Sequence, residues 1–429
     1  MTLLIISPDY ASHLLPLATL GTAWQQAGQR VVVATGTATA PIVESFGFER
    51  AHLQLGKGSN PGVIRAEQQP TGEDDALRGF FEATRAGMVP TLAFQARARL
   101  SDLMWDPVRV GREVQAVVAA VAPDVVIVDH LAFSARLALV AGGIAHADVL
   151  VGHPSALPVG DEVYGFPPIW PRAFDPDPDE LADLRELCER VSESFTAEWN
   201  SALAELNPAA PPSRAAFSEH GDLLLLNYPA ALSDSARELP PHVFLGSAVR
   251  EEGPDVEVDE WLASSAEPFV YVSFGSFLSV RSDVLARVCE ALARSGLRAA
   301  IALGSADRAD LGPLPDGWLV REFLPQVTLL GSAAAAVTHG GNNSVTEAMT
   351  SGVPLLVLPF STDQFAGAAA IEAAGVGVAL SPNDATVGDL TDALAAVIAL
   401  PRETLDAVSA DLRQSPGSSR AFAALSPTS

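Results

Sequence analysis

The chain has 429 residues, enough for two or three domains of ordinary size. It carries 52 acidic against 26 basic residues, a formal net charge of -26, and so lacks the basic surface that binding of nucleic-acid phosphates requires. Two cysteines, no Lys or Arg before Arg30 and no long uncharged apolar segment predict a cytoplasmic protein without a disulfide framework or a membrane span.

The first half of the chain alternates short apolar runs with longer amphipathic or alanine-rich stretches. This alternation is typical of buried parallel strands joined by helices and predicts an α/β fold. A helix is predicted over residues 9–29, with Gly28 at its C-terminal end. Residues 56–75 and 167–178 are rich in turn formers and predict loops. The predicted strands are residues 3–7, 31–34, 125–128, 148–151 and 223–226.

The second half repeats the alternation after a junction rich in proline and acidic residues, 239–257. The predicted strands are residues 269–273, 299–303, 319–321, 335–338 and 354–359. We therefore expect an N-terminal Rossmann-like domain over 1–250 and a second over 251–405. Residues 406–429 are expected to form a helix or tail with little core of its own, with a return to the N-terminal domain as one option.

Polar residues follow the predicted strands in both halves. In open parallel sheets, ligands bind beyond the carboxyl ends of the strands, where loops and helix N-termini converge. His13 follows the first strand, and Asp129 ends the strand 125–128, whereas Asp124 begins that strand and faces away. The second half has polar residues at the same place, after the ends of its predicted strands: Ser276, the segment 339–344 and the pair 363–364. All of these groups are expected to face one cleft.

The most informative segment runs from Thr338 to Glu347, with the sequence THGGNNSVTE. It reads as a strand end, a glycine pair and a helix start. A helix N-terminus has unpaired backbone donors and positive dipole character, so it can hold a diphosphate without a lysine cluster. An ordinary helix cap after a tight turn explains the glycines and Ser344 equally well when they are taken alone.

Residues 319–377 resemble the nucleotide-sugar signature of the UDP-glycosyltransferase superfamily. The likeness rests on the segment FLPQ at 323–326, the pattern H-x-G-x-N-S-x-x-E from His339 to Glu347, GVP at 352–354 and DQ at 363–364. SFGS at 273–276 and SHLLPL at 12–17 are similar to two further family motifs. The resemblance implies the GT-B fold, in which two Rossmann-like domains face each other across a cleft, and an inverting transferase of the bacterial natural-product or macrolide type.

The resemblance also implies roles for individual residues toward the donor. Phe323 stacks on the base, Leu324 and Gln326 lie near base and ribose, and Glu347 binds the ribose. Phe323 stands where the family motif has Trp, which leaves open whether the base is thymine or uracil, and Asn342 stands where plant members usually have Trp, which leaves the contact to the sugar open. The remaining implied contacts are to the phosphates or the donor sugar: Ser276, His339, Gly341, Asn342, Asn343, Ser344, Asp363 and Gln364.

The same matching implies a catalytic pair in the first half. His13 is the expected general base toward an acceptor hydroxyl, and Asp129 is its expected partner. His130, beside Asp129, is interpreted as structural, with a substrate contact as the alternative. The helix start at Asn342 is expected to stabilise the leaving diphosphate, so neither a metal ion nor a cofactor is expected.

The expected reaction moves a hexose or deoxyhexose from a dTDP- or UDP-sugar to a hydrophobic small molecule, such as a polyketide, aromatic or macrolide natural product. Its pocket is expected in the N-terminal domain, around residues 56–75, 80–81, 94 and 152–170. Two other functions stay open: an epimerase acting on a nucleotide sugar, and a non-catalytic nucleotide-sugar-binding protein. The chain is expected to be a monomer or a homodimer.

Overall fold

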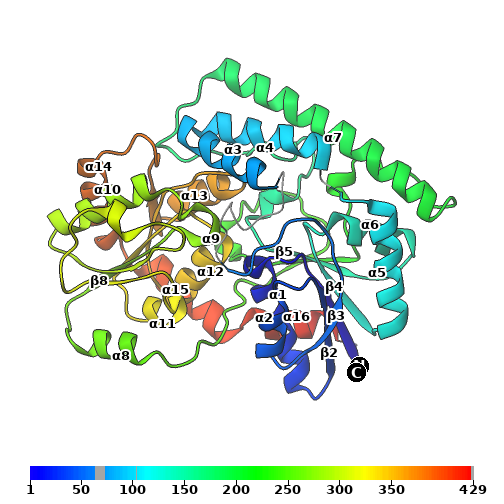
Figure 1. The fold of residues 1–429 in the computed structure, drawn as a ribbon, viewed down its shortest axis with the longest axis horizontal. Coiled ribbons are helices and arrows are strands. Elements are labelled where there is room, and N and C mark those ends of the chain that lie inside the picture. Colours follow the sequence, from blue (N-terminus) through cyan, green and yellow to red (C-terminus); the bar gives the residue numbers. More distant parts are fainter. Residues whose placement is uncertain (63–72, 103, 427–429) are drawn as a thin grey trace.

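The apolar runs of the sequence form two parallel sheets, each flanked by helices (Figure 1). The structure, a computed structural model, describes residues 1–62, 73–102 and 104–426. Within these residues the first sheet has the strand order β3-β2-β1-β4-β5-β6-β7 and the second has the order β10-β9-β8-β11-β12-β13. The strands are β1 Thr2–Ile6, β2 Arg30–Thr35, β3 Glu49–His52, β4 Val125–Asp129, β5 Ala147–Leu150, β6 Leu223–Leu226, β7 His242–Phe244, β8 Phe269–Ser273, β9 Arg298–Ala302, β10 Leu319–Arg321, β11 Ala335–Thr338, β12 Leu355–Val357 and β13 Gly377–Ala379.

Helices cover both faces of each sheet, which explains why the strands are continuously apolar. In β1, Leu3 and Ile5 enter one core while Leu4 and Ile6 enter another, because successive side chains of a strand point to opposite faces. The helices are α1 Ala11–Gln26, α2 Ala40–Ser45, α3 Glu73–Ala86, α4 Met88–Asp102, α5 Pro107–Val121, α6 Phe133–Ala141, α7 Pro178–Leu206, α8 Val256–Ala263, α9 Gly275–Leu278, α10 Ser282–Arg294, α11 Gln326–Leu330, α12 Asn342–Ser351, α13 Gln364–Ala373, α14 Val387–Ile398, α15 Glu403–Gln414 and α16 Gly417–Leu425.

All ten strands predicted from the sequence are present, with ends that differ by at most two residues. Three further strands, β3, β7 and β13, were not predicted. Each lies at the edge of its sheet, and β3 carries the sequence ERAH, which has no apolar run for a pattern to detect. The predicted helix after the first strand is α1, and Gly28 beyond its end has a φ of 70°.

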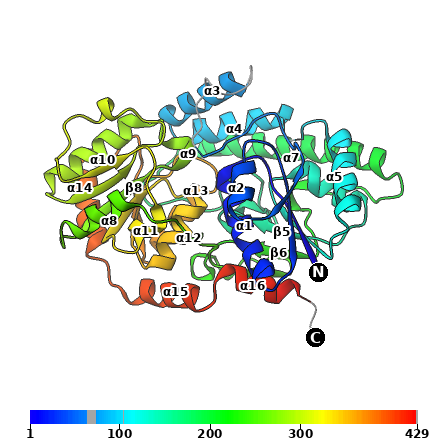
Figure 2. The same ribbon diagram turned by 60° about the horizontal axis from the view of Figure 1, so that its bottom comes forward.

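The C-terminal helices join the two halves. Figure 2 shows α15 and α16 running along one side of the molecule, with α15 below the second half and α16 below the first. α15 packs against α12, and α16 packs against α1, where the rings of Trp24 and Phe422 lie 5.1 Å apart. The segment around residues 415–419, expected to be a tail, therefore leads into a packed helix, and Ala421 within that helix is fully buried.

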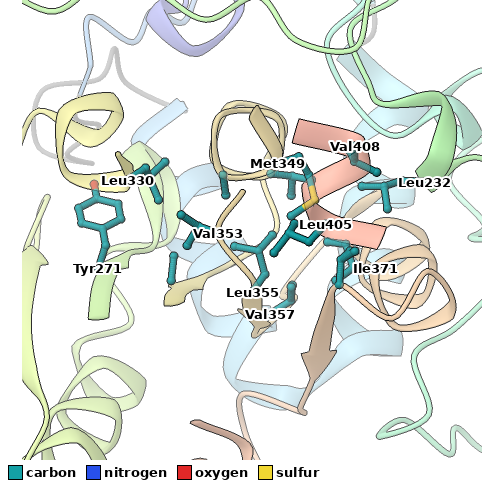
Figure 3. Close-up of a cluster of buried hydrophobic side chains, with 14 of the residues drawn as sticks. Leu232, Tyr271, Leu330, Met349, Val353, Leu355, Val357, Ile371, Leu405 and Val408 are labelled. Carbon is teal, nitrogen blue, oxygen red and sulfur yellow. The ribbon is translucent and has the colours of Figure 1, made fainter. Parts of the chain in front are cut away.

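A core beneath α12 fixes the position of this helix. Met349 from α12 lies in a buried cluster with Leu405 and Val408 from α15 and Leu355 from β12 (Figure 3). Leu232, from the first half, belongs to the same cluster. Because this packing anchors the C-terminal part of α12, the N-terminus of the helix is held at the edge where the strands of the second sheet end.

The chain passes from one sheet to the other between β7 and α8. Residues 245–255, all of them described, have no helix or strand, and the expected boundary at residue 250 falls among them. The limits of the domains stay predictions. Within the described ranges, every helix is too short or too polar to cross a lipid bilayer.

Candidate active site

A cavity of about 810 Å³ lies between the two halves, at the carboxyl ends of their strands. Both halves line it: His13, Asp129 and Gly152 come from the first, and Gly275 and Asn343 come from the second. The parallel strands of each sheet bring their carboxyl ends to one edge, so segments far apart in the sequence meet here. This is the cleft predicted from the strand ends.

The predicted pair His13 and Asp129 is in contact. β1 and β4 pair in parallel, with Ile6 opposite Val128, so the residues that follow the two strands become neighbours. Nδ1 of His13 lies 2.8 Å from Oδ2 of Asp129, and Oδ1 of Asp129 accepts a hydrogen bond of 2.8 Å from the backbone N–H of Leu131. Asp129 thus holds the ring with a proton on Nδ1 and leaves Nε2 able to accept one.

The electrostatics of this pair favour a basic imidazole. Burial lowers the pKa of His13, but the charge and the hydrogen bond of Asp129 outweigh burial and raise the pKa above its usual value. Asp363, across the cleft, raises it further. Asp124 lies at the opposite end of the strand, where it accepts a hydrogen bond of 2.6 Å from the backbone of Thr2.

His130 has the opposite environment. It is 2% exposed, and burial together with the nearby Arg136 guanidinium lowers its pKa to about 3. Arg136 donates to the His130 carbonyl and forms a buried ion pair of 2.6 Å with Asp148. His130 therefore belongs to a buried cluster inside the first half but also lines the cavity, so both the structural interpretation and the substrate contact stay predictions.

The helix start predicted from the THGGNNSVTE segment is the N-terminus of α12. Gly340 has a φ of 87°, a backbone conformation that favours glycine, and Gly341 is the residue before the helix. A side chain at Gly341 would begin 2.4 Å from Nε2 of His339, so only glycine fits over this ring. Gly341, Asn342, Asn343 and Ser344 all line the cavity.

Two asparagines of α12 reach across the cleft to the first half. Asn343 donates to the carbonyl oxygen of Ser12 at 3.2 Å. That oxygen is available because Pro16, four residues later in α1, has no N–H to donate to it. Asn342 exchanges hydrogen bonds with Asn227, donating to its carbonyl oxygen at 2.7 Å and accepting from its side chain at 2.8 Å. Asn342, which was predicted to contact the nucleotide sugar, therefore joins the two halves in this structure.

His339 is buried beneath the helix start. Burial lowers its pKa to about 4, while a hydrogen bond to the backbone of Ser273 acts in the opposite direction. Among the described residues, its Nδ1 has no hydrogen-bond partner. At neutral pH, His339 is uncharged and carries a single N–H, which can donate to the Ser273 backbone or to a ligand but not to both.

Glu347 is buried behind the cavity wall, where it is held by two residues that do line the cavity. Gln326, from the start of α11, and Arg250, from the segment that links the sheets, both donate to its carboxylate. Arg250 also pairs with Glu252 at 2.9 Å. Burial raises the pKa of Glu347, and Arg250 and Gln326 partly counter this shift. Sequence reasoning missed Arg250, since a single arginine in an irregular linker carries no pattern.

Asp363 and Gln364 stabilise the turn that follows β12. Asp363 lines the cavity and accepts a hydrogen bond of 2.6 Å from the backbone N–H of His153, in the first half. A side chain at Gly152 would begin 2.7 Å from this carboxylate, so glycine leaves room for the contact. Burial raises the pKa of Asp363, although the bonds from His153 and Thr362 oppose the shift. Oε1 of Gln364 accepts from the backbone N–H groups of Phe360 and Ser361 at 3.0 and 3.2 Å.

Two further residues predicted to contact the nucleotide lie at the cavity. Phe323 and Leu324 line it, and Phe323 is 55% exposed, an unusual state for a large aromatic residue. Ser276 lies in α9, but its side chain is outside the part of the chain that the structure describes.

Aromatic residues of the first half form another wall of the cavity. Phe80, Phe94, Tyr164 and Phe166 line it, as the sequence predicted for an apolar acceptor pocket. Phe81 is instead buried in a small cluster against the second half. The predicted loop 56–75 ends in α3, which begins at Glu73, and residues 63–72 lie outside the described residues.

Comparisons with known proteins agree with this arrangement. Residues 186–409 match the family model described as UDP-glucoronosyl and UDP-glucosyl transferase, which is just over half of the chain. The mouse 2-hydroxyacylsphingosine 1-beta-galactosyltransferase is 32% identical over 42% of this chain and 34% of its own length. The 4'-demethylrebeccamycin synthase of Lentzea aerocolonigenes is 30% identical over 42% of this chain and 43% of its own. The chain thus spans less than half the length of these relatives.

A solved structure with the same fold covers nearly the whole chain. The glycosyltransferase VinC, in complex with DTDP, superposes with a TM-score of 0.67 over 99% of this chain and 98% of its own, at 20% identity. At this level of identity the likeness concerns the fold. It confirms the predicted GT-B architecture of two parallel-sheet α/β halves.

Proposed function

We propose, because this chain belongs to the family of UDP-glucoronosyl and UDP-glucosyl transferases, that it transfers a sugar from a nucleoside diphosphate sugar to a hydroxyl group of an apolar small molecule. One observation carries the proposal. The hydrogen-bonded pair His13 and Asp129 lines the same cavity as the N-terminus of α12, so a base and a diphosphate site face each other across one cleft.

The donor would bind along the second half. Its diphosphate would lie at the start of α12, where the backbone donors near Asn342, the Ser344 hydroxyl and the His339 ring converge. The base would stack on the exposed ring of Phe323, and Glu347, held by Gln326 and Arg250, would accept from the ribose hydroxyls. The complex of VinC with DTDP supports a thymidine nucleotide as the first donor to test.

His13 would act as the general base. An acceptor hydroxyl is a poor nucleophile until its proton is removed, and Nε2 of His13 is free to take that proton. The Asp129 carboxylate then stabilises the imidazolium that forms. The deprotonated oxygen attacks the anomeric carbon as the bond to the diphosphate breaks, and this single displacement inverts the anomeric centre.

Charge that develops on the leaving diphosphate would be stabilised by the helix N-terminus and by the N–H groups around it. These groups supply the positive character that a bound cation would otherwise provide, so we expect transfer without a metal ion. The donor sugar would lie near Asp363, whose position is fixed by the His153 backbone.

The test is a screen of dTDP- and UDP-sugars against hydroxyl-bearing aromatic and macrolide acceptors, with detection of products by mass spectrometry and with EDTA as a separate arm. We expect a glycosylated acceptor, and release of nucleoside diphosphate only when the acceptor is present. Conversion of the sugar without an acceptor would instead indicate an epimerase. Tight nucleotide binding without turnover would indicate a binding protein, and loss of transfer in EDTA would contradict metal independence.

A further inference from the structure

One helix of the first half presents a continuous face to the cavity. Phe94, Gln95, Ala98 and Arg99 of α4 all line it. Their spacing, i, i+1, i+4 and i+5, places them on one side of an α-helix. This face is apolar except for an amide and a guanidinium, which lie one helical turn apart.

Arg99 is held at the cavity wall by an aromatic platform. The centre of its guanidinium lies 4.9 Å from the centroid of the Tyr164 ring. Tyr164 in turn stacks on Phe217 at 3.8 Å, which keeps the platform rigid. A side chain at Gly165 would begin 3.0 Å from Nη1 of Arg99, so the glycine leaves room for the guanidinium.

Across the described residues, the Arg99 guanidinium has no carboxylate partner and no hydrogen bond to the protein. The other arginine of the cavity, Arg250, is paired with both Glu347 and Glu252. Acidic residues outnumber basic ones two to one in this chain, so an unpaired arginine in the cavity contrasts with its surroundings.

Gln95 adds a second unsatisfied group. Its Oε1 atom is buried and has no hydrogen-bond partner among the described residues. An amide oxygen can only accept a hydrogen bond, so a carboxylate cannot satisfy it, and the group of Gln95 that can bond to an acid is its NH₂. The planar fork of Arg99 matches the two oxygens of a carboxylate, and the aromatic wall suits a ring.

From these contacts, and resting on the proposed function, we propose that the acceptor is an aromatic acid. Its carboxylate binds to Arg99 beside the amide NH₂ of Gln95, its ring packs against Phe94, and its hydroxyl group reaches His13. The proposed acceptor is thereby narrowed from any apolar small molecule to an aromatic one that carries a carboxylate.

The test compares acids with their neutral esters. The probes are 6-hydroxy-2-naphthoic acid, 4-hydroxycinnamic acid and 4'-hydroxybiphenyl-4-carboxylic acid, each beside its methyl ester. Binding to the full chain saturated with thymidine diphosphate is measured by calorimetry. We expect at least one acid to bind about tenfold more tightly than its ester, with a preference that weakens as salt is added.

Three variants assign the preference to its residue. Arg99→Met keeps the length of the side chain and should abolish the preference, and Arg99→Lys should retain part of it. Arg97→Met is the matched control, because Arg97 is an exposed residue of the same helix outside the cavity, and it should leave the preference unchanged. A melting temperature measured for each variant shows that it is folded.

The proposal is overturned if acids and esters bind equally, if none of the acids binds, or if Arg99→Met weakens both forms alike, which would mean that Arg99 acts through packing alone. Sugar transfer is measured separately. Preferred binding of the acids without transfer would reject the proposed function and leave the acid site standing. Equal transfer to acids and esters, with equal binding, would reject the acid site alone.

Discussion

The two walls of the cavity differ in how their polar side chains are paired. On the donor side, polar side chains come mainly from one stretch of sequence and are already paired: Glu347 with Arg250 and Gln326, and Asn342 with Asn227. On the acceptor side, the lining comes from separate segments of the first half, is mostly apolar with several aromatic rings, and includes Arg99 without a carboxylate partner among the described residues. Polar groups that are already paired suit a ligand of fixed chemistry, whereas the acceptor wall, apart from the pair His13 and Asp129, leaves the Arg99 guanidinium for the ligand.

The largest expected effect separates binding from chemistry. Replacing His13 by Ala should lower the turnover rate by about 10²- to 10⁴-fold, because the acceptor hydroxyl loses its base. Nucleotide affinity, measured by calorimetry, should stay within about twofold because the donor wall is intact. His242→Ala is the control, since His242 is exposed and lies outside the cavity, where its ring bonds to the Pro240 carbonyl and contacts Phe244. Loss of nucleotide binding together with turnover would place His13 in the donor site instead.

A smaller effect, with a distinct pH signature, is expected for Asp129→Asn. In the wild type, activity should fall as the pH drops through the raised pKa of His13, because a protonated imidazole cannot act as base. Without the Asp129 charge, burial dominates and the pKa of His13 falls, so the acidic limb should move to lower pH. The plateau rate should fall on the order of 10²-fold because the imidazolium loses its partner. An unchanged acidic limb in the rate profile would contradict the assignment.

On the donor wall, Arg250→Met should raise KM for the nucleotide sugar about tenfold and leave kcat nearly unchanged. Burial already raises the pKa of Glu347, and removing the arginine should raise it further. Donor affinity should therefore recover as the pH is increased, because Glu347 is ionised again. Arg298→Met is the control, because Arg298 lies on β9 outside the cavity and has no carboxylate partner among the described residues. Steady-state kinetics at several pH values measure both parameters. A lower kcat at constant KM would contradict a role of Arg250 in binding the nucleotide sugar.

The smallest effect is expected at Phe323. Replacement by Ala should weaken nucleotide binding by about 1–3 kcal/mol, the usual contribution of stacking a base on an aromatic ring. The free energy of unfolding should hardly change, since the ring is 55% exposed. Phe323→Trp should restore or strengthen binding because it enlarges the stacking surface. Equal affinity in all three proteins would show that the base lies elsewhere.

The sequence predicted the buried strands and the strand-end residues well, because a continuous apolar run and a motif are both local signals. It missed β3, β7 and β13 because edge strands need no apolar run. It could not predict contacts that depend on how the halves meet, such as Asn343 with Ser12 or Asp363 with the His153 backbone. Arg99 and Gln95 were missed for the same reason, because only the folded chain shows that the Arg99 guanidinium and Oε1 of Gln95 have no hydrogen-bond partner among the described residues.

The most direct measurement is the configuration of the product. With a nucleotide sugar whose anomeric centre is α, the proton NMR spectrum of the glycosylated acceptor should show the β-anomer, because His13 and the start of α12 lie on opposite halves of the cavity. Single displacement between these two groups predicts this result. A product with retained α-configuration would contradict the account.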